Sequence, residues 1–302
     1  MALSKLNNDS FADTAVHGRR NLIINGAMQV AQRGDVTGKT SSSYGGPDRF
    51  RLGLSGAGTH SISQSSTVPS GSGFSNSWKL DCTTADTTPT LMAAQYRFEG
   101  QDLQQLKKGT SSAESVTVSF WVRSNVTGTY VLEWRDRDNT RHIAKTYTIS
   151  AADTFEYKTL TFAGDTSGTI DNNNGHSMEL SWWLAASSTY TSGTLPSSWA
   201  AETDANRAAG LNVNIAGDTA NEWLITGVQL EVGDKATPFE HRSFGEELAL
   251  CQRYTWTIND TGWVSYIQVK WYRTIRVYLF FTKFGERTMF QYSRCKIRTW
   301  FI

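Results

Sequence analysis

The run Glu114-Ser-Val-Thr-Val-Ser-Phe-Trp-Val-Arg123 decides the fold class, because apolar side chains occupy every second position in it. The apolar face consists of Val116, Val118, Phe120 and Val122. Trp121 falls on the opposite face. A period of two predicts a β-strand that is buried on one side.

Similar runs lie on both sides of this strand. They begin at Asp48, Ser77, Leu91, Tyr130, Ile143, Phe155, Met178 and Glu222. Turns rich in Gly, Asn and Asp separate them. A short turn of helix is expected at Leu103–Leu106, and Phe244 to Tyr254 has helical spacing. Many short strands with few helices predict an all-β fold, specifically an antiparallel jelly-roll β-sandwich. We expect the last strand, Val228 to Gly233, to close the sandwich beside the first.

Composition excludes several classes of protein. The chain has 302 residues, of which 39% are hydrophobic, and a net charge of +1. It can therefore build a core, and its overall charge does not attract nucleic acid or an anionic membrane. No signal peptide and no transmembrane span are predicted. Cys82, Cys251 and Cys295 are too far apart in the sequence to predict a zinc site or a disulfide framework, and we interpret them as small buried side chains.

A search for catalytic motifs predicts neither an enzyme nor a cofactor, because HExxH, P-loop, GxSxG and GxGxxG patterns are absent. The run Asp171–His176 resembles a calcium loop faintly and is interpreted as a turn. A structural calcium ion elsewhere stays open, since backbone carbonyl ligands leave no trace in a sequence. Asp136 with Asp138, or Glu133, offers the acids of a glycosidase, but these residues flank a predicted hairpin turn, where acids are common.

Aromatic side chains are the candidates for stacking on sugar rings. They are Trp121, Trp134, Trp182, Trp183 and Tyr190. Because Trp182 and Trp183 are adjacent on one predicted strand, they face opposite sides, so we expect one in the core and the other on the outer face. The alternative is that these rings fill the core or a subunit interface.

Two segments bracket the β-rich body. The first is Arg20-Asn-Leu-Ile-Ile-Asn-Gly-Ala-Met-Gln-Val-Ala-Gln-Arg-Gly34, and the second is Trp223-Leu-Ile-Thr-Gly-Val-Gln-Leu-Glu-Val-Gly233, followed by Ala236-Thr-Pro-Phe-Glu-His-Arg242. Together they resemble a family of bacteriophage virion proteins described as tail-fibre or appendage proteins. The resemblance implies a structural protein of the virion, made in the host cytoplasm and assembled as a homotrimer.

The resemblance and the composition divide the chain into three parts. Residues 1–19 are expected to be an arm that attaches to other tail or virion proteins, 20–240 the sandwich, and 241–302 a helix with a basic, aromatic extension. The last forty residues, 263–302, carry eight basic side chains and one acid, unlike the family. They are either a specialised tip or the product of a shifted reading frame.

The predicted function is therefore that of a non-enzymatic tail-fibre or appendage subunit that contacts host surface polysaccharide. Two alternatives remain. One is a carbohydrate-binding module, which needs an exposed aromatic pair beside polar groups. The other is a glycan-degrading tailspike, which needs paired acids in a groove.

Overall fold

The computed structural model describes residues 19–260, 263–267 and 279–282. The chain divides into two compact units, Met1–Cys251 and Gln252–Ile302. The second unit contains an antiparallel sheet of β14 (Ile258–Asp260), β15 (Trp263–Ile267) and β16 (Leu279–Thr282). Most of the predicted arm at 1–19, Cys295 and most of the basic extension lie outside the described residues.

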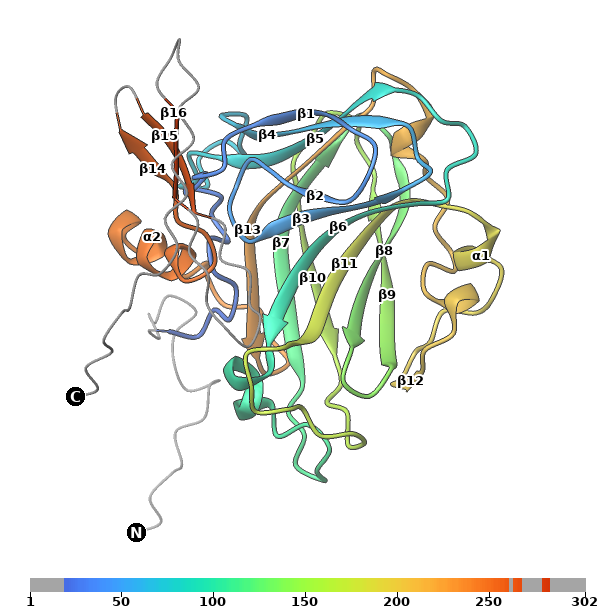
Figure 1. Cartoon of the computed structure of the whole chain (residues 1–302). Coiled ribbons are helices and arrows are strands. Elements are labelled where there is room, and N and C mark those ends of the chain that lie inside the picture. The colour runs from blue at the N-terminus through green and yellow to red at the C-terminus, as the bar shows by residue number, and fades with distance from the viewer. Residues whose placement is uncertain (1–18, 261–262, 268–278, 283–302) are drawn as a thin grey trace, which may run out of the picture. The chain divides into compact units, whose positions relative to one another are not determined.

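The first unit contains a six-stranded antiparallel sheet with the order β1-β4-β5-β13-β7-β10 (Figure 1). Its strands are β1 (Val36–Lys39), β4 (Thr59–Ser65), β5 (Ser77–Thr84), β7 (Val116–Ser124), β10 (Glu156–Phe162) and β13 (Glu222–Val232). The alternating run around Phe120 forms β7, as predicted. The last strand does not lie beside the first: β13 pairs with β5 and β7 in the middle of the sheet. Burial of nearly all its residues fits this central place.

The second sheet of this unit has seven strands in the order β12-β9-β8-β11-β6-β3-β2, again all antiparallel. Its strands are β2 (Ser43–Tyr44), β3 (Phe50–Ser55), β6 (Leu91–Glu99), β8 (Gly128–Asp136), β9 (Arg141–Ile149), β11 (His176–Ala186) and β12 (Ala200–Ala201). The two sheets form the predicted jelly-roll β-sandwich.

Helices are short and few in the described residues. They are α1 (Ser188–Thr191), α2 (Phe244–Gln252) and the 3-10 helices η2 (Gly100–Leu106), η3 (Asp204–Asn206) and η4 (Ile215–Gly217). The predicted helix corresponds to α2, which ends two residues earlier than expected. The described helices include none that is long and apolar enough to cross a membrane.

The core lies between the two sheets and is rich in aromatic rings. Trp78 and Trp223 come from the six-stranded sheet, and their ring centroids are 6.4 Å apart. Phe120 meets Trp182 of the other sheet edge-to-face at 5.7 Å. Cys82 and Cys251 are also buried, as expected. Inward rings at alternate positions therefore account for the strand pattern that the sequence shows.

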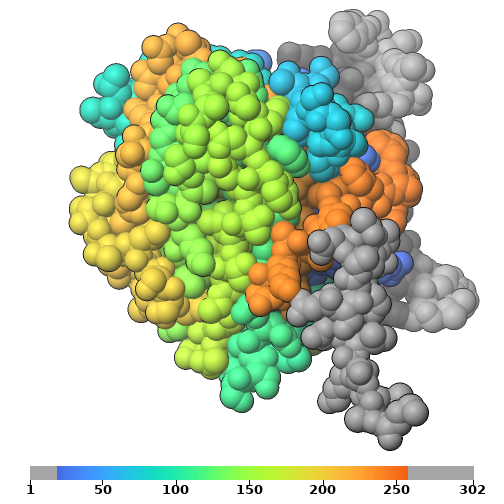
Figure 2. Space-filling model, turned by 180° about the vertical axis from the view of Figure 1, so that it is seen from behind, coloured from blue at the N-terminus to red at the C-terminus, as the bar shows by residue number. Residues whose placement is uncertain are grey.

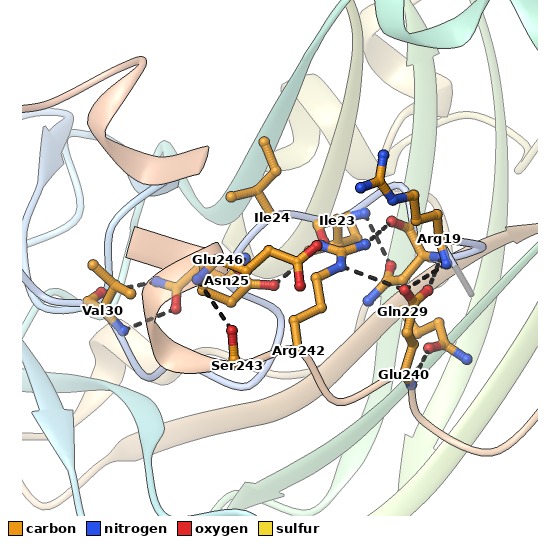
Figure 3. Close-up of polar contacts among 12 residues, drawn as sticks. Arg19, Ile23, Ile24, Asn25, Val30, Gln229, Glu240, Arg242, Ser243 and Glu246 are labelled. Atoms are coloured by element: carbon orange, nitrogen blue, oxygen red, sulfur yellow. Dashed lines mark hydrogen bonds and ion pairs between the residues drawn. The ribbon is translucent and has the colours of Figure 1, made fainter. Parts of the chain in front are cut away.

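The two bracketing sequence segments lie against each other. The carboxylate of Glu240 accepts hydrogen bonds from the backbone N–H groups of Arg19 and Asn21, both at 2.7 Å (Figure 3). Nη1 of Arg242 donates to the carbonyl oxygen of Ile23 at 3.1 Å and to Glu247 at 3.0 Å. We call this set of contacts between residues 19–30 and 228–247 the clasp.

Asn25 holds the tight bend within the first segment of the clasp. Its backbone has a φ of 63°, a left-handed conformation that Asn tolerates better than most residues. Its side chain donates to the carbonyl oxygens of Val30 (2.8 Å) and Asp48 (3.0 Å) and accepts from the N–H of Val30 (2.9 Å). The next residue must be glycine, since a Cβ on Gly26 would lie 2.1 Å from the carbonyl oxygen of Val228.

Glu247 tests the clasp. Its buried carboxylate accepts from the backbone N–H of Asn25 and from Arg242. We expect Glu247→Ala to lower the free energy of unfolding by about 2–4 kcal/mol, because it leaves the buried N–H of Asn25 without its acceptor and removes one of several acceptors of the Arg242 guanidinium. Glu246→Ala, at the exposed neighbouring position of the same helix, is the matched control. Urea denaturation measures both, and equal effects would contradict this role of the clasp.

Candidate functional site

The outer face of the seven-stranded sheet carries three rows of side chains, set by the strand register. Ala93, Trp183 and Val131 are cross-strand neighbours in the first row. Gln95, Ser181 and Glu133 form the second row, and Arg97, Glu179 and Arg135 form the third row. The face therefore changes from apolar to charged along the strands.

Residues 187–211, which we call the cover segment, pack over the apolar row. Tyr190 lies with its ring centroid 5.1 Å from that of Trp183. The guanidinium of Arg207 lies over both rings, 5.1 Å from the Trp183 centroid and 5.7 Å from that of Tyr190. Trp183 is left with no solvent-exposed surface. The cover segment thus closes the part of the face that would otherwise present an indole to a ligand.

Glu133, on the sheet beneath the cover segment, binds Arg207 of that segment. Its carboxylate accepts hydrogen bonds from Arg207 (3.0–3.3 Å), from Nδ1 of His142 (2.9 Å) and from Nε1 of Trp183 (3.1 Å). Burial alone would raise the pKa of Glu133, but hydrogen bonds from His142 and the charge of Arg207 outweigh it and lower that pKa below its ordinary value. The carboxylate is therefore ionised and fully engaged.

Burial corrects the expectation for the paired tryptophans. Trp182 and Trp183 do face opposite sides of β11, but neither has any exposed surface. Trp182 packs in the core against Phe120, and Trp134 packs there against Phe98 at 5.2 Å. Adjacent positions on a strand separate two faces, but they do not determine whether another segment covers the outer one. Trp182, Trp183 and Trp134 are thus packing residues in this structure.

Trp121 is the candidate that the structure leaves at the surface. It is half-buried on the outer face of the six-stranded sheet, where its ring centroid lies 5.3 Å from that of Tyr157, which is 46% exposed. The two residues are cross-strand partners of β7 and β10. Tyr190 is also half-buried, but its ring is committed to Trp183.

Other rings adjoin this pair: Phe74 is buried beside Trp121, Phe239 is half-buried and His241 is exposed. Gly227, with φ of 61°, makes room for Phe74, since a Cβ there would lie 2.6 Å from Phe74 and 3.2 Å from Trp121. Phe74 packs against Phe239 at 4.9 Å and His241 at 5.3 Å. We call Tyr157, Trp121, Phe74, Phe239 and His241 the aromatic strip. Figure 2 shows this side, where the loop before β5 (cyan), the segment after β13 (orange) and the green strands meet.

The third row of the seven-stranded sheet is rich in arginine. Buried Glu179 accepts from Nε of Arg97 at 3.0 Å and from Gln95 at 3.2 Å, and Gln95 in turn accepts from Arg51. His176 lies with Nε2 3.4 Å from the same carboxylate of Glu179. Burial lowers the pKa of His176, and the charges of four arginines lower it further, to about 3. These are Arg97, Arg137, Arg135 and Arg51.

The three acids considered for glycoside hydrolysis are not arranged as a pair in an open groove. Glu133 is buried under the cover segment, and Asp136 is fully buried against Lys108. Asp138 is exposed and accepts from the backbone N–H of Asp171 at 3.0 Å. Asp136 and Asp138 therefore hold turns together, as the sequence indicated.

A lysine occupies the place where a cation would be expected. Nζ of Lys108, on a side chain only 4% exposed, contacts Asp136, Asp165 (3.1 Å) and the carbonyl oxygens of Ser167 (3.0 Å) and Gly168 (2.8 Å). Within the described ranges, no group of three His, Cys, Asp or Glu side chains is placed to hold a metal ion. The ammonium itself supplies the positive charge between these oxygens.

Comparisons with known proteins give only distant likenesses. No protein-family model and no curated protein sequence matches the chain. Among solved structures, the enzymatically active domain of tailspike protein 4 of bacteriophage CBA120 is 12% identical, with a TM-score of 0.37, over 70% of this chain and 21% of that chain. This chain thus spans about a fifth of that tailspike chain.

Carbohydrate-binding modules are also among the similar structures. A CBM4 structure is 10% identical over 69% of this chain and 97% of that chain, with a TM-score of 0.35. The CBM22-1 xylan-binding domain of Paenibacillus barcinonensis Xyn10C is 9% identical over 74% of this chain and all of that chain, with a TM-score of 0.32. Likenesses at this level do not place a ligand on this chain.

Sequence reasoning missed the arginine row and most of the aromatic strip. Each arginine follows the outward period of its own strand, as Arg97 does two residues after Gln95, but nothing in one strand shows which other strands lie beside it. Phe239 and His241 lie outside the predicted strands, in the segment that follows β13. A signal for Tyr157 was present, because it alternates with Phe155 in a strand-like run.

The ion pair beneath the cover segment gives a prediction about stability. Arg207→Ala should lower the free energy of unfolding by about 3–5 kcal/mol, because it leaves the buried carboxylate of Glu133 without its charged partner. Arg207→Ala combined with Glu133→Gln should recover part of this loss, since the uncompensated charge is then gone. Urea denaturation of both variants checks this. A double variant no more stable than Arg207→Ala would contradict it.

His176 predicts a dependence of stability on pH. Its pKa of about 3 in the folded chain lies below the ordinary 6.5, so the unfolded chain binds this proton first as the pH falls. Stability should therefore decrease from pH 7 toward pH 5, and His176→Asn should decrease less over that range. Melting temperatures at pH 7, 6 and 5 measure the difference. Parallel pH profiles would rule out this contribution of His176; other groups, such as buried His60, contribute equally to both proteins.

Proposed function

We propose that the chain is a non-enzymatic structural subunit of a bacteriophage particle, a tail fibre or appendage, whose sandwich contacts host surface glycans through the aromatic strip. The phage assignment is supported by the resemblance of the bracketing segments, which the clasp brings together in space. The glycan contact is supported by the surface pair of half-buried Trp121 and exposed Tyr157. In this proposal the chain assembles as a homotrimer and attaches to the particle through residues 1–19.

The Trp121–Tyr157 pair is the observation that carries the glycan contact. Large rings at a surface offer a flat apolar area with a polar edge, which suits the apolar face of a pyranose. Arg123 lies two residues after Trp121 on the same face of β7, with Nη2 2.8 Å from Asp153. Rings with fixed polar groups beside them are the arrangement expected of a sugar-binding surface.

A free-standing carbohydrate-binding module is the second candidate, favoured by the same aromatic pair. It differs in having no particle to join. A density map of the particle that shows this chain, with threefold copies, would support the virion role. Light scattering that gives one 33.6 kDa species at high concentration would contradict the trimer.

A glycan array tests the aromatic strip. We expect Trp121→Ala and Tyr157→Ala each to weaken binding about tenfold or more, since each removes one ring of the stacking surface. Both melting temperatures should stay close to that of the parent, because both rings lie outside the core.

Trp256→Ala is the matched control for these variants. Trp256 is 56% exposed and lies outside the sandwich unit, so its removal should leave binding unchanged. A Trp121→Ala chain that folds and binds as tightly as the parent would refute the role of the aromatic strip.

A further inference from the structure

A second surface lies on the other sheet, and it is cationic. Arg51, Arg97 and Arg135 belong to β3, β6 and β8, and Arg137 follows β8 in the turn. The backbone N–H of Arg137 donates to the carbonyl oxygen of Ser177 at 2.7 Å, which places this turn beside the start of β11. The four residues form what we call the arginine cluster.

The carboxylates near this cluster are already committed. Glu179 is only 2% exposed and pairs with Arg97, while Glu202 accepts from both Nε and Nη2 of Arg135. Glu99, opposite His176 in the strand register, accepts from Gln101 at 2.6 Å. Arg51 has the neutral amide of Gln95 as its hydrogen-bond partner. Two of the four guanidinium groups, those of Arg51 and Arg137, thus have no ion-pair partner among the described residues.

The arginines are held in place before any ligand arrives. Glu179 binds Nε of Arg97, which fixes the plane of that half-buried guanidinium group. Gln95 bridges Glu179 and Arg51, so one buried acid positions both guanidinium groups. Planar guanidinium groups fixed in this way suit a carboxylate, which they bind through paired hydrogen bonds.

His176 stands among these four arginines. Burial lowers the pKa of His176 first, and the charges of the arginines lower it further, so it adds a hydrogen-bonding ring and no further charge. The same arginine charges attract an anion to this place.

An aromatic ring adjoins the cluster. Tyr44 is the cross-strand partner of Arg51 in β2 and β3, and it is half-buried. Arg33 lies 4.9 Å from the centroid of its ring. A ring next to a guanidinium can hold the flat face of a sugar while the guanidinium binds the carboxylate of that sugar. A small free carboxylate, such as acetate, would contact only the guanidinium.

We propose that the arginine cluster, with Tyr44, binds the carboxylate of an acidic saccharide such as a hexuronate oligomer. This site lies on the seven-stranded sheet, and the aromatic strip lies on the six-stranded sheet. The proposal therefore does not rest on glycan binding by Trp121.

Isothermal titration of the full chain with a hexuronate oligomer tests the proposal, beside the same oligomer after chemical reduction of its carboxyl groups. The acidic oligomer should bind, and the reduced one should bind about tenfold more weakly or not at all. Acetate at equal ionic strength is the small-carboxylate probe. Equal affinity for the reduced oligomer, or for acetate, would overturn the proposal, as would no binding of the acidic oligomer.

Variants locate the site. Arg51→Gln should weaken binding of the acidic oligomer about tenfold or more. Lys79→Gln in β5, on the six-stranded sheet, is the control for an equal change of net charge. If Arg51→Gln does not fold, exposed Arg137→Gln replaces it, because its backbone bond to Ser177 is kept. A folded variant of the cluster that binds as tightly as the parent would refute the assignment.

Discussion

The clasp is the constraint on which the rest of the sandwich depends. It joins residues about 200 positions apart, since Asn21 accepts from the N–H of Leu230 at 3.1 Å and Arg242 donates to Ile23. Joining such distant segments costs chain entropy that only many simultaneous bonds can offset. Because β13 lies between β5 and β7, the same contacts also fix the central strand of the six-stranded sheet. The bracketing segments are therefore parts of one structural unit, which gives a physical reason for their occurrence together.

Buried charges organise the remainder of the structure. Lys108 holds Asp136 and Asp165 at one end of the sandwich, and Glu133 holds Arg207 on the outer face of the seven-stranded sheet. Such pairs add little net stability relative to apolar packing, but losing one partner is costly. Each buried charged group forms several hydrogen bonds with groups on different loops. Only one arrangement of those loops therefore provides all of its hydrogen-bond partners. We infer that these pairs select loop positions more than they raise overall stability.

The strands were predictable from sequence because burial on one face imposes a period of two, which β7 shows clearly. The outward position of Trp121 followed from the same period. The burial of an outward-facing side chain by another segment was not predictable. Trp183 also faces outward from its strand, yet the cover segment buries it, and the sequence of that segment has no regular apolar period. The arginine cluster was not predictable either, because Arg51, Arg97 and Arg135 become neighbours only through the pairing of strands far apart in the chain.

The cover segment makes the two outer faces different in kind. On the seven-stranded sheet it buries the outward-facing indole of Trp183 and leaves the neighbouring charged row uncovered. On the six-stranded sheet, Gly227 leaves space in which buried Phe74 approaches Trp121, and the half-buried ring of Trp121 stays at the surface. Stacking on rings depends little on ionic strength, whereas attraction to arginines is screened by salt. If both surfaces bind saccharide, rising salt should weaken the arginine-dependent contact and spare the aromatic one. The two contributions can thus be separated in a single chain.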